Sequence, residues 1–407
     1  MHSRTFSAVM ALIACVHAAP VNQNPTSQTD IANIPAGYKA GFTNATVQPS
    51  ANGKAICISG LVDVTASGTN LHINGGVPTN QTAVTELFVE SVQIDSTVRQ
   101  RLVGNQTHVS GTYGIYSELC FPAAQGVINS TTIQLLVPGS GFDRNYWNVA
   151  PGYSYVDSAA EQGYTTFFFD RLGTGLSDHP DALQVVQTGL QVSIVHELVH
   201  LLRTGGIAGQ KFEHVVGVGH SYGSFQLQLL TAAYPKDVDA AVFTGFSNAT
   251  DGEPIAFAGL DLTIASQAVP SRFSNLSNGY LTSSSALGDQ FFFFRAPGFD
   301  PKILELADAT KSTITLGEYL TFGTFAVAEN FTGPIEVVTG EYDLPNCHGD
   351  CMFPYNKLAA VKDNLYPNAN NNSDWYVVPG SGHGINFHYE AMNAYQHIQN
   401  FIKKNGF

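Results

Sequence analysis

The stretch that decides the fold is HVVGVGHSYGSFQLQLL, residues 214–230. It joins an apolar run typical of a buried strand to a G-x-S-x-G turn and then to a helical run. A serine at such a turn has a strained backbone that lifts its Oγ clear of the sheet. The backbone N–H of Tyr222, at the start of the helix, then faces a developing oxyanion. The stretch therefore predicts a nucleophile, Ser221, with Tyr222 as an oxyanion donor.

A regular pattern continues on both sides of this stretch: short apolar runs alternate with segments of helical periodicity. This alternation is typical of a parallel sheet covered by helices. The expected strands are 133–137, 164–169, 214–218, 240–244, 334–339 and 375–378, and the expected helices are 183–203, 224–233 and 389–404.

The N-terminal part of the chain has a different pattern. Residues 20–50 are polar and rich in proline, and we expect them to form a flexible leader. Residues 51–128 are expected to be a β-rich region that joins the core sheet. The strand candidates in this region are 56–58, 61–64, 86–89, 92–94 and 112–121.

Residues 1–19 have the layout of a secretory signal peptide. Arg4 precedes an apolar stretch over 6–16, and small residues follow at Ala18 and Ala19. The alternative, a membrane anchor, needs about 20 apolar residues, and this stretch is far shorter. We expect cleavage after Ala18 or Ala19, a secreted extracellular protein and no membrane span.

The cysteines and the glycosylation motifs agree with secretion. Four of the five cysteines follow the signal, and the pairs Cys57–Cys120 and Cys347–Cys351 are favoured because each lies in one local region. A zinc site at Cys347 and Cys351 lacks a second cluster of ligands. Eight Asn-x-Ser/Thr motifs follow the signal, at Asn44, Asn80, Asn105, Asn129, Asn248, Asn275, Asn330 and Asn371.

Composition excludes two classes of partner. The 407-residue chain has a formal net charge of −14, and charged residues make up only 12% of it. With no cluster of lysine or arginine, neither nucleic acid nor an anionic membrane surface is an expected partner. Uncharged polar side chains or sugars must therefore cover much of the surface.

Residues from about 130 to 404 resemble the α/β-hydrolase superfamily, and a secreted serine esterase or lactonase in particular. Beside the serine turn, the match rests on LLVPGSG at 135–141, with Pro138 where the family's oxyanion loop usually has histidine, and on FDRLGTGLS at 169–177. The resemblance implies an α/β fold with a mostly parallel twisted sheet flanked by helices, and the N–H of Ser140 as the second oxyanion donor. It also implies a core formed by 129–245 and 331–407, with a cap inserted at 246–330.

The family's acid and base loops have matches in the right order. PIEVVTGEYD at 334–343 ends in Asp343, and VVPGSGHG at 377–384 contains His383. The resemblance implies a triad of Ser221, Asp343 and His383, in the order that this fold uses. Alternatives within the site are Asp350 or Asp251 as the acid and His388 as the base. His220, beside the nucleophile, shapes the pocket or is a packed structural histidine.

A second motif competes with this site. HELVH at 196–200 matches the H-E-x-x-H pattern of zinc proteases, and its spacing puts His196 and His200 on one face of a helix. No third ligand is evident downstream, and the helix also fits a crossover between two parallel strands. We therefore predict no metal and no cofactor.

The predicted function follows from the resemblance. It is a secreted serine hydrolase that cleaves a carboxylic ester or lactone of an apolar or aromatic small molecule through an acyl-enzyme intermediate. Phe291–Phe294 either line an acyl pocket or form the core of the cap. The same triad also fits a thioesterase, an amidase or peptidase, or a non-hydrolytic cyclase. A non-catalytic binding protein on the same fold is the alternative from another class.

Overall fold

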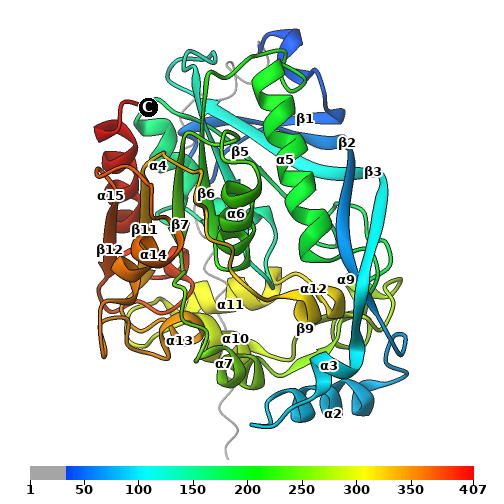
Figure 1. Ribbon diagram of the computed structural model, residues 1–407. Coiled ribbons are helices and arrows are strands. Elements are labelled where there is room, and N and C mark those ends of the chain that lie inside the picture. The colour runs from blue at the N-terminus through cyan, green and yellow to red at the C-terminus, as the bar shows by residue number, and fades with distance from the viewer. Residues whose placement is uncertain (1–33) are drawn as a thin grey trace, which may run out of the picture.

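A nine-stranded sheet forms the centre of the molecule (Figure 1). The computed structural model describes residues 34–407, so the predicted signal peptide and the first part of the predicted leader lie outside the described residues. In order across the sheet, the strands are β1 (Thr43–Pro49), β2 (Ala55–Ile73), β3 (Val103–Pro122), β5 (Thr165–Phe169), β4 (Thr132–Val137), β6 (His214–His220), β7 (Ala240–Thr244), β11 (Ile335–Gly340) and β12 (Asp374–Val378).

The six strands from β5 to β12 are parallel, as the alternating pattern predicts. Their side chains are apolar on both faces, and each face supports its own core. One core includes α5 (Thr188–Thr204), α6 (Tyr222–Ala233) and α14 (Lys357–Leu365). The other includes α4 (Tyr155–Glu161) and α15 (Ala391–Lys404). The predicted mostly parallel sheet flanked by helices is therefore confirmed.

The helix predicted at 183–203 begins later, at Thr188. The side chain of Gln187 exchanges hydrogen bonds with the backbone of Leu71, at 2.8 Å in both directions. These bonds attach the start of α5 to strand β2, and the preceding residues form turns instead of helix.

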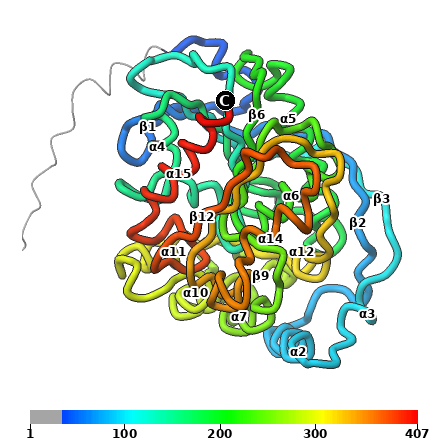
Figure 2. The backbone as a smooth tube through the Cα atoms, turned by 60° about the vertical axis from the view of Figure 1, so that its left-hand side comes forward, coloured from blue at the N-terminus to red at the C-terminus, as the bar shows by residue number. Residues whose placement is uncertain are grey.

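Strands β2 and β3 form a long antiparallel hairpin that reaches beyond the sheet (Figure 2). Two segments predicted as strands, 86–89 and 92–94, are not strands: the first lies in helix α2 (Gln81–Ser91) and the second in the turn that follows. Asn80 caps this helix by accepting the N–H of Ala83 at 3.0 Å. The short helix α3 (Val98–Leu102) follows and leads into β3.

Part of the predicted flexible leader is ordered structure. The 3₁₀ helix η1 (Ala36–Lys39) precedes β1, which pairs antiparallel with β2 at the edge of the sheet. Tyr38 packs edge-on against Phe121, with ring centroids 5.4 Å apart. The polar sequence of β1 fits an edge strand because most of its side chains are exposed.

Between β7 and β11 the chain forms a cap over the carboxyl ends of the parallel strands (Figure 1). A small sheet in the order β10-β9-β8 lies among its helices. The elements are α7 (Glu253–Leu260), β8 (Leu262–Ile264), α8 (Ala265–Ala268), α9 (Pro270–Phe273), β9 (Tyr280–Ser283), α10 (Ala286–Phe293), α11 (Pro301–Thr310), β10 (Ile314–Thr315) and α12 (Leu316–Thr321). Helix α2 contacts α7 and β8, so the hairpin also reaches the cap.

The remaining elements are short, and they lie in loops of the core. They are η2 (Arg144–Trp147), α13 (Leu344–Cys347) and η3 (Ile385–Phe387). Within residues 34–407, no helix has the length and apolar character that crossing a bilayer requires.

Candidate active site

Ser221 lies at the sharp turn between strand β6 and helix α6. Its backbone has φ +53° and ψ −118°, a conformation that is strained for a residue with a side chain. The turn is tight because a Cβ on Gly223 would lie 2.1 Å from the carbonyl oxygen of Val137. On the other side, a Cβ on Gly219 would lie 2.6 Å from the Cα of Ser224. The G-x-S-x-G pattern is therefore the sequence that this turn can accommodate.

His383 lies between Ser221 and Asp343. Its Nε2 is 2.7 Å from the Oγ of Ser221, and its Nδ1 is 2.7 Å from Oδ2 of Asp343. Because a carboxylate oxygen accepts, Nδ1 donates to Asp343 and Nε2 is left to accept the hydroxyl proton of Ser221. The structure thus brings together the three residues predicted as a triad, from loops up to 162 positions apart in the chain.

Asn346 joins this arrangement, although no sequence motif predicts it. Its backbone N–H donates to Oδ1 of Asp343 at 2.8 Å, and its side-chain amide donates to the carbonyl of Gly245 at 2.8 Å. Asp343 is the N-cap of the short helix α13, so its second oxygen is held by the same turn. Both Asp343 and His383 are buried, which shields their interaction from water.

The alternative acids and base lie in other settings. Asp251 and Asp350 are exposed, and Oδ1 of Asp350 accepts the N–H of Met352 at 3.0 Å. Burial lowers the pKa of His388 to about 4. Its Nε2 accepts two backbone N–H groups, each at 3.0 Å, from Arg295 and Gly382. His388 therefore stabilises the loop as a neutral side chain.

His220 packs beneath the site. Its ring stacks on Tyr146, with centroids 4.2 Å apart, and lies 5.0 Å from the ring of His383. Burial, together with the nearby His383, holds the pKa of His220 well below its usual value. A neutral imidazole places no second positive charge beside His383. Of the two roles predicted for it, the packed histidine fits this geometry.

The two predicted oxyanion donors lie on either side of Ser221. Tyr222 is the first residue of α6, where a backbone N–H has no partner within the helix. Ser140 lines the same cavity as Ser221, and its N–H donates no hydrogen bond to any residue among 34–407. Both groups are therefore free to donate to a bound oxygen.

A buried ion pair supports the loop of Ser140 from behind. Arg171 pairs with Glu318 of the cap helix α12 and donates to the carbonyl of Gly139 at 3.2 Å. Gln191 accepts from Arg171 at 2.9 Å and donates to Glu318 at 2.8 Å. The match at 169–177 contains Arg171, but no sequence pattern links it to a partner 147 residues away.

A cavity opens above Ser221. Its walls are mostly aromatic or aliphatic and come from the core and the cap. They include Phe225, Phe246, Phe257, Phe292, Ile314, Tyr319, Phe322 and Phe325. Of the predicted segment Phe291–Phe294, Phe292 lines the cavity, whereas Phe293 packs on Phe142 and His383, Phe294 packs on Phe387, and Phe291 is 48% exposed. Both interpretations of that segment therefore hold in part.

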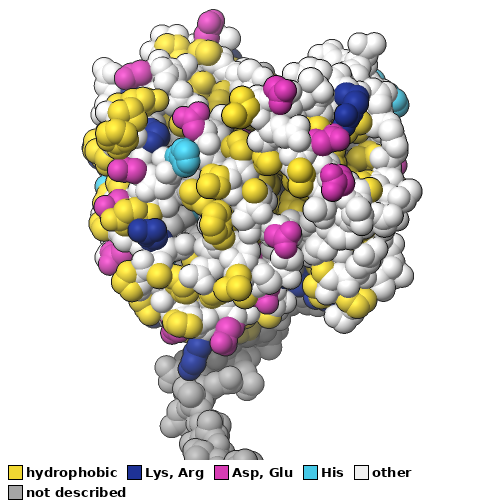
Figure 3. All heavy atoms as spheres, turned by 90° about the horizontal axis from the view of Figure 1, so that it is seen from below, with side chains coloured by type: hydrophobic (Ala, Val, Ile, Leu, Met, Phe, Trp, Pro, Cys, Tyr) yellow, Lys and Arg dark blue, Asp and Glu magenta, His cyan; other side chains and the backbone are white. Residues whose placement is uncertain are grey.

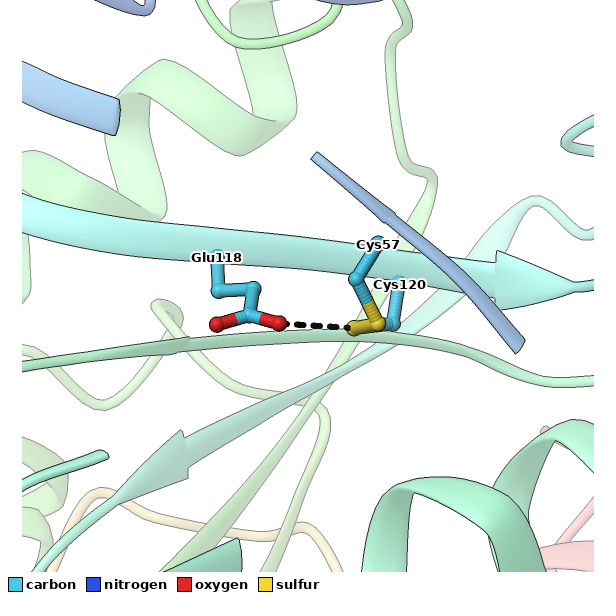
Figure 4. Close-up of side chains that lie close together, drawn as sticks. All are labelled: Cys57, Glu118 and Cys120. Atoms are coloured by element: carbon cyan, nitrogen blue, oxygen red, sulfur yellow. Dashed lines mark hydrogen bonds between the residues drawn. A yellow bond between two sulfur atoms is a disulfide. The ribbon is translucent and has the colours of Figure 1, made fainter. Parts of the chain in front are cut away.

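Both predicted disulfides are present. Cys57 and Cys120 lie directly opposite each other on β2 and β3, with Glu118 beside them (Figure 4). Their thiols and this carboxylate are close enough together for a metal site, but both sulfurs are used in the disulfide and are not available as thiolate ligands. Cys347–Cys351 closes a short loop directly after Asp343.

The H-E-x-x-H motif does not form a metal site. His196 pairs with Asp237, 2.7 Å from Nδ1 to Oδ2, and stacks on Tyr234 with centroids 3.9 Å apart. His200 is exposed on the surface of α5. Within residues 34–407, these two histidines belong to no cluster with metal-ligand spacing. The helix is a crossover between parallel strands.

The family model of the alpha/beta hydrolase family matches residues 134–395. The chain belongs to the alpha/beta hydrolase family. This membership supports a hydrolase activity, and it confirms the resemblance that the motifs suggest.

Solved structures of the same fold are similar to the chain, and comparison with curated proteins found no match. One is a thermophilic esterase from Thermogutta terrifontis, at 13% identity and a TM-score of 0.51, covering 73% of this chain and 96% of the esterase. Another is a monoacylglycerol lipase from Paleococcus ferrophilus, at 13% identity and a TM-score of 0.45, covering 67% of this chain and 95% of the lipase. At this identity the likeness concerns the fold alone.

Proposed function

We propose that the protein is a secreted serine hydrolase that cleaves a carboxylic ester or lactone through an acyl-enzyme intermediate. The observation that carries the proposal is the continuous chain of hydrogen bonds from Ser221 through His383 to Asp343. The strained backbone of Ser221 adds to it, because such strain at a strand-to-helix turn is a property of nucleophiles in this fold.

The geometry supports the following sequence of steps. His383 Nε2 takes the proton of Ser221 as Oγ attacks the carbonyl carbon, and Asp343 holds the imidazolium that forms. The N–H groups of Ser140 and Tyr222 donate to the oxyanion, each contributing roughly 3–4 kcal/mol to stabilisation of the transition state. The protonated His383 then gives its proton to the leaving alkoxide. A water molecule, deprotonated by His383, attacks the acyl-enzyme and releases the acid and free Ser221.

The cavity supports an apolar or aromatic substrate. Six of the fifteen residues that line it are phenylalanines, and apolar contact with such a wall favours hydrocarbon over polar groups. Two carboxyl side chains line the cavity: Glu318 is paired with Arg171, and burial raises the pKa of Glu253 to about 8.

Labelling with a fluorophosphonate probe tests the nucleophile. We expect modification of Ser221, identified by peptide mass spectrometry, and no labelling of Ser221→Ala. The same variant should lose roughly 10⁶-fold in kcat on esters. A panel of esters, lactones, thioesters and amides then separates the ester hydrolase from a thioesterase, an amidase or a cyclase. Labelling at another serine, or turnover that survives Ser221→Ala, would refute the proposal.

Secretion is supported by three features of the chain. They are the N-terminal signal layout, the two disulfides, and the exposure of the glycosylation motifs. Seven of the eight asparagines are exposed, and Asn248 is half-buried. Expression in a eukaryotic secretory host should yield protein in the medium whose mass falls on treatment with an N-glycosidase. Retention inside the cell without glycans would contradict this part of the proposal.

A further inference from the structure

A second cavity adjoins the one above Ser221. Four residues line both cavities and form the boundary between them: Glu253, Phe257, Tyr319 and Phe322. Because the two spaces share these walls, they lie next to each other, and Ser221 lines the inner one. The outer one is lined by residues of helix α3. This helix lies at the end of the β2–β3 hairpin (Figure 2).

The two cavities differ in chemistry. The inner cavity is largely apolar, whereas Ser91, Ser96, Arg99 and Gln100 from the hairpin bring polar groups into the outer one. A ligand that occupies both must therefore be amphiphilic, with its apolar part nearest to Ser221. Apolar side chains are common on the face of the molecule that carries the cap, and charged ones are scattered there singly (Figure 3).

Arg99 is the cation of the outer cavity. It is exposed, and it forms no ion pair with any carboxylate among residues 34–407. Arg101, two positions further along α3, differs in this respect because it pairs with Glu90. An arginine without a partner at the mouth of a cavity offers a planar pair of N–H donors to a carboxylate.

Glu253 does not neutralise that arginine at neutral pH. Burial raises the pKa of its carboxyl group to about 8, although Arg99 opposes this shift. At pH 7 the group is therefore mostly protonated and can donate a hydrogen bond. A protonated acid beside Arg99 suits a ligand with a single negative charge.

We propose that the two cavities form one substrate path, and that Arg99 at its outer end binds a carboxylate at the far end of the substrate's acyl chain. The inference rests on the proposed ester hydrolysis and names its substrate class: esters whose apolar acyl chain ends in a carboxylate. Arg99 and α3 lie outside residues 134–395, which match the family, so this end of the path belongs to the hairpin that this chain adds to the fold.

Two series of p-nitrophenyl esters test the proposal. One series has alkyl acyl chains of increasing length, and the other has the same chains ending in a carboxylate. We expect wild type to prefer the carboxylate series at the length that spans both cavities. Arg99→Gln should lower kcat/KM for that ester by roughly 10- to 100-fold, and it should leave the alkyl ester unchanged. Arg99→Lys, which keeps the charge, should retain part of the preference.

Arg101→Gln is the matched control, because it removes an arginine from the same helix that lines neither cavity. It should leave both series unchanged. The inference is overturned if wild type shows no preference at any length, or if Arg99→Gln and Arg101→Gln have equal effects. Hydrolysis of p-nitrophenyl acetate, which is too short to reach Arg99, reports on Ser221 separately. If wild type does not hydrolyse the acetate, the proposed function itself fails.

Discussion

Replacing Asp343 by asparagine tests the triad at its least exposed member. Asparagine has nearly the same shape as aspartate, and its amide oxygen can still accept the N–H of Asn346, now 2.8 Å from Oδ1. The other side-chain atom, 2.7 Å from Nδ1 of His383, becomes an NH₂ group that donates. Nδ1 must then accept, so the ring carries its proton on Nε2. In that tautomer His383 cannot take the proton of Ser221.

The expected loss in kcat is roughly 10⁴-fold, which corresponds to about 5 kcal/mol of activation free energy. The assay is hydrolysis of p-nitrophenyl acetate, together with the rate of fluorophosphonate labelling at Ser221. Labelling should slow with turnover, because both reactions need Ser221 to lose its proton. The thermal unfolding midpoint controls for damage to the fold.

Asp350→Asn is the matched control. Asp350 lies in the disulfide-closed loop that follows Asp343, but it is exposed, and its carboxylate accepts the backbone N–H of Met352. It should retain activity within a few-fold of wild type, as surface substitutions usually do. A loss below tenfold in Asp343→Asn, or an equal loss in Asp350→Asn, would refute the assignment of the acid.

Three further predictions follow from the packing and the charges. By lowering the chain entropy of the unfolded state, the bond Cys347–Cys351 stabilises the fold by only about 2 kcal/mol, against about 4 kcal/mol for Cys57–Cys120. Because the short bond closes the loop directly after Asp343, the double variant Cys347→Ser/Cys351→Ser should lose kcat with little change in thermal midpoint. Arg171→Met leaves Glu318 buried without a cation and should lower the free energy of unfolding by about 3–5 kcal/mol in denaturant titrations, part of which Arg171→Met/Glu318→Leu should recover. Folding raises the pKa of Glu253 from its usual 4.5 to about 8, so the wild type loses stability as pH rises between these values. The free energy of unfolding of Glu253→Gln should therefore exceed that of the wild type by roughly 2–4 kcal/mol at pH 8 and equal it at pH 4. The first argument fails if the cysteine variant loses stability as much as activity. The second fails if Glu318→Leu recovers none of the loss, and the third fails if the stability difference of Glu253→Gln does not change with pH.

The core of the fold could be predicted because its signals are local. Except for the edge strand β12, each parallel strand is a short run that is almost entirely buried, and the turn at Ser221 needs glycines that the sequence displays. The positions of Asp343 and His383 follow from the loops after two such strands. What the sequence lacks is any sign of side chains that meet only in the folded chain, such as Arg171 with Glu318.

The wrong predictions concern short segments whose hydrophobic pattern does not distinguish a helix, a strand and a loop. The segment 86–89 is apolar enough for a strand, yet it lies in helix α2, which belongs to the connection between β2 and β3. Asn80 then starts a helix there. The prolines of residues 20–50 predict a flexible leader, but β1 needs only backbone groups to pair with β2, and an edge strand accepts polar side chains.

The contacts of Arg171 also bear on how substrate reaches Ser221. Lifting the cap from the core would separate Arg171 from Glu318 and expose both, although each is almost completely buried. The same movement would remove the donor from the carbonyl of Gly139, next to the proposed oxyanion donor Ser140. An opening of that kind costs several kcal/mol and disturbs the site that it is meant to serve. A path that enters beside α3 needs no such movement, because its mouth lies between the hairpin and the cap. The buried ion pair and the second cavity therefore favour the same conclusion: the cap is a fixed wall of the site, and substrate enters from the side of the hairpin.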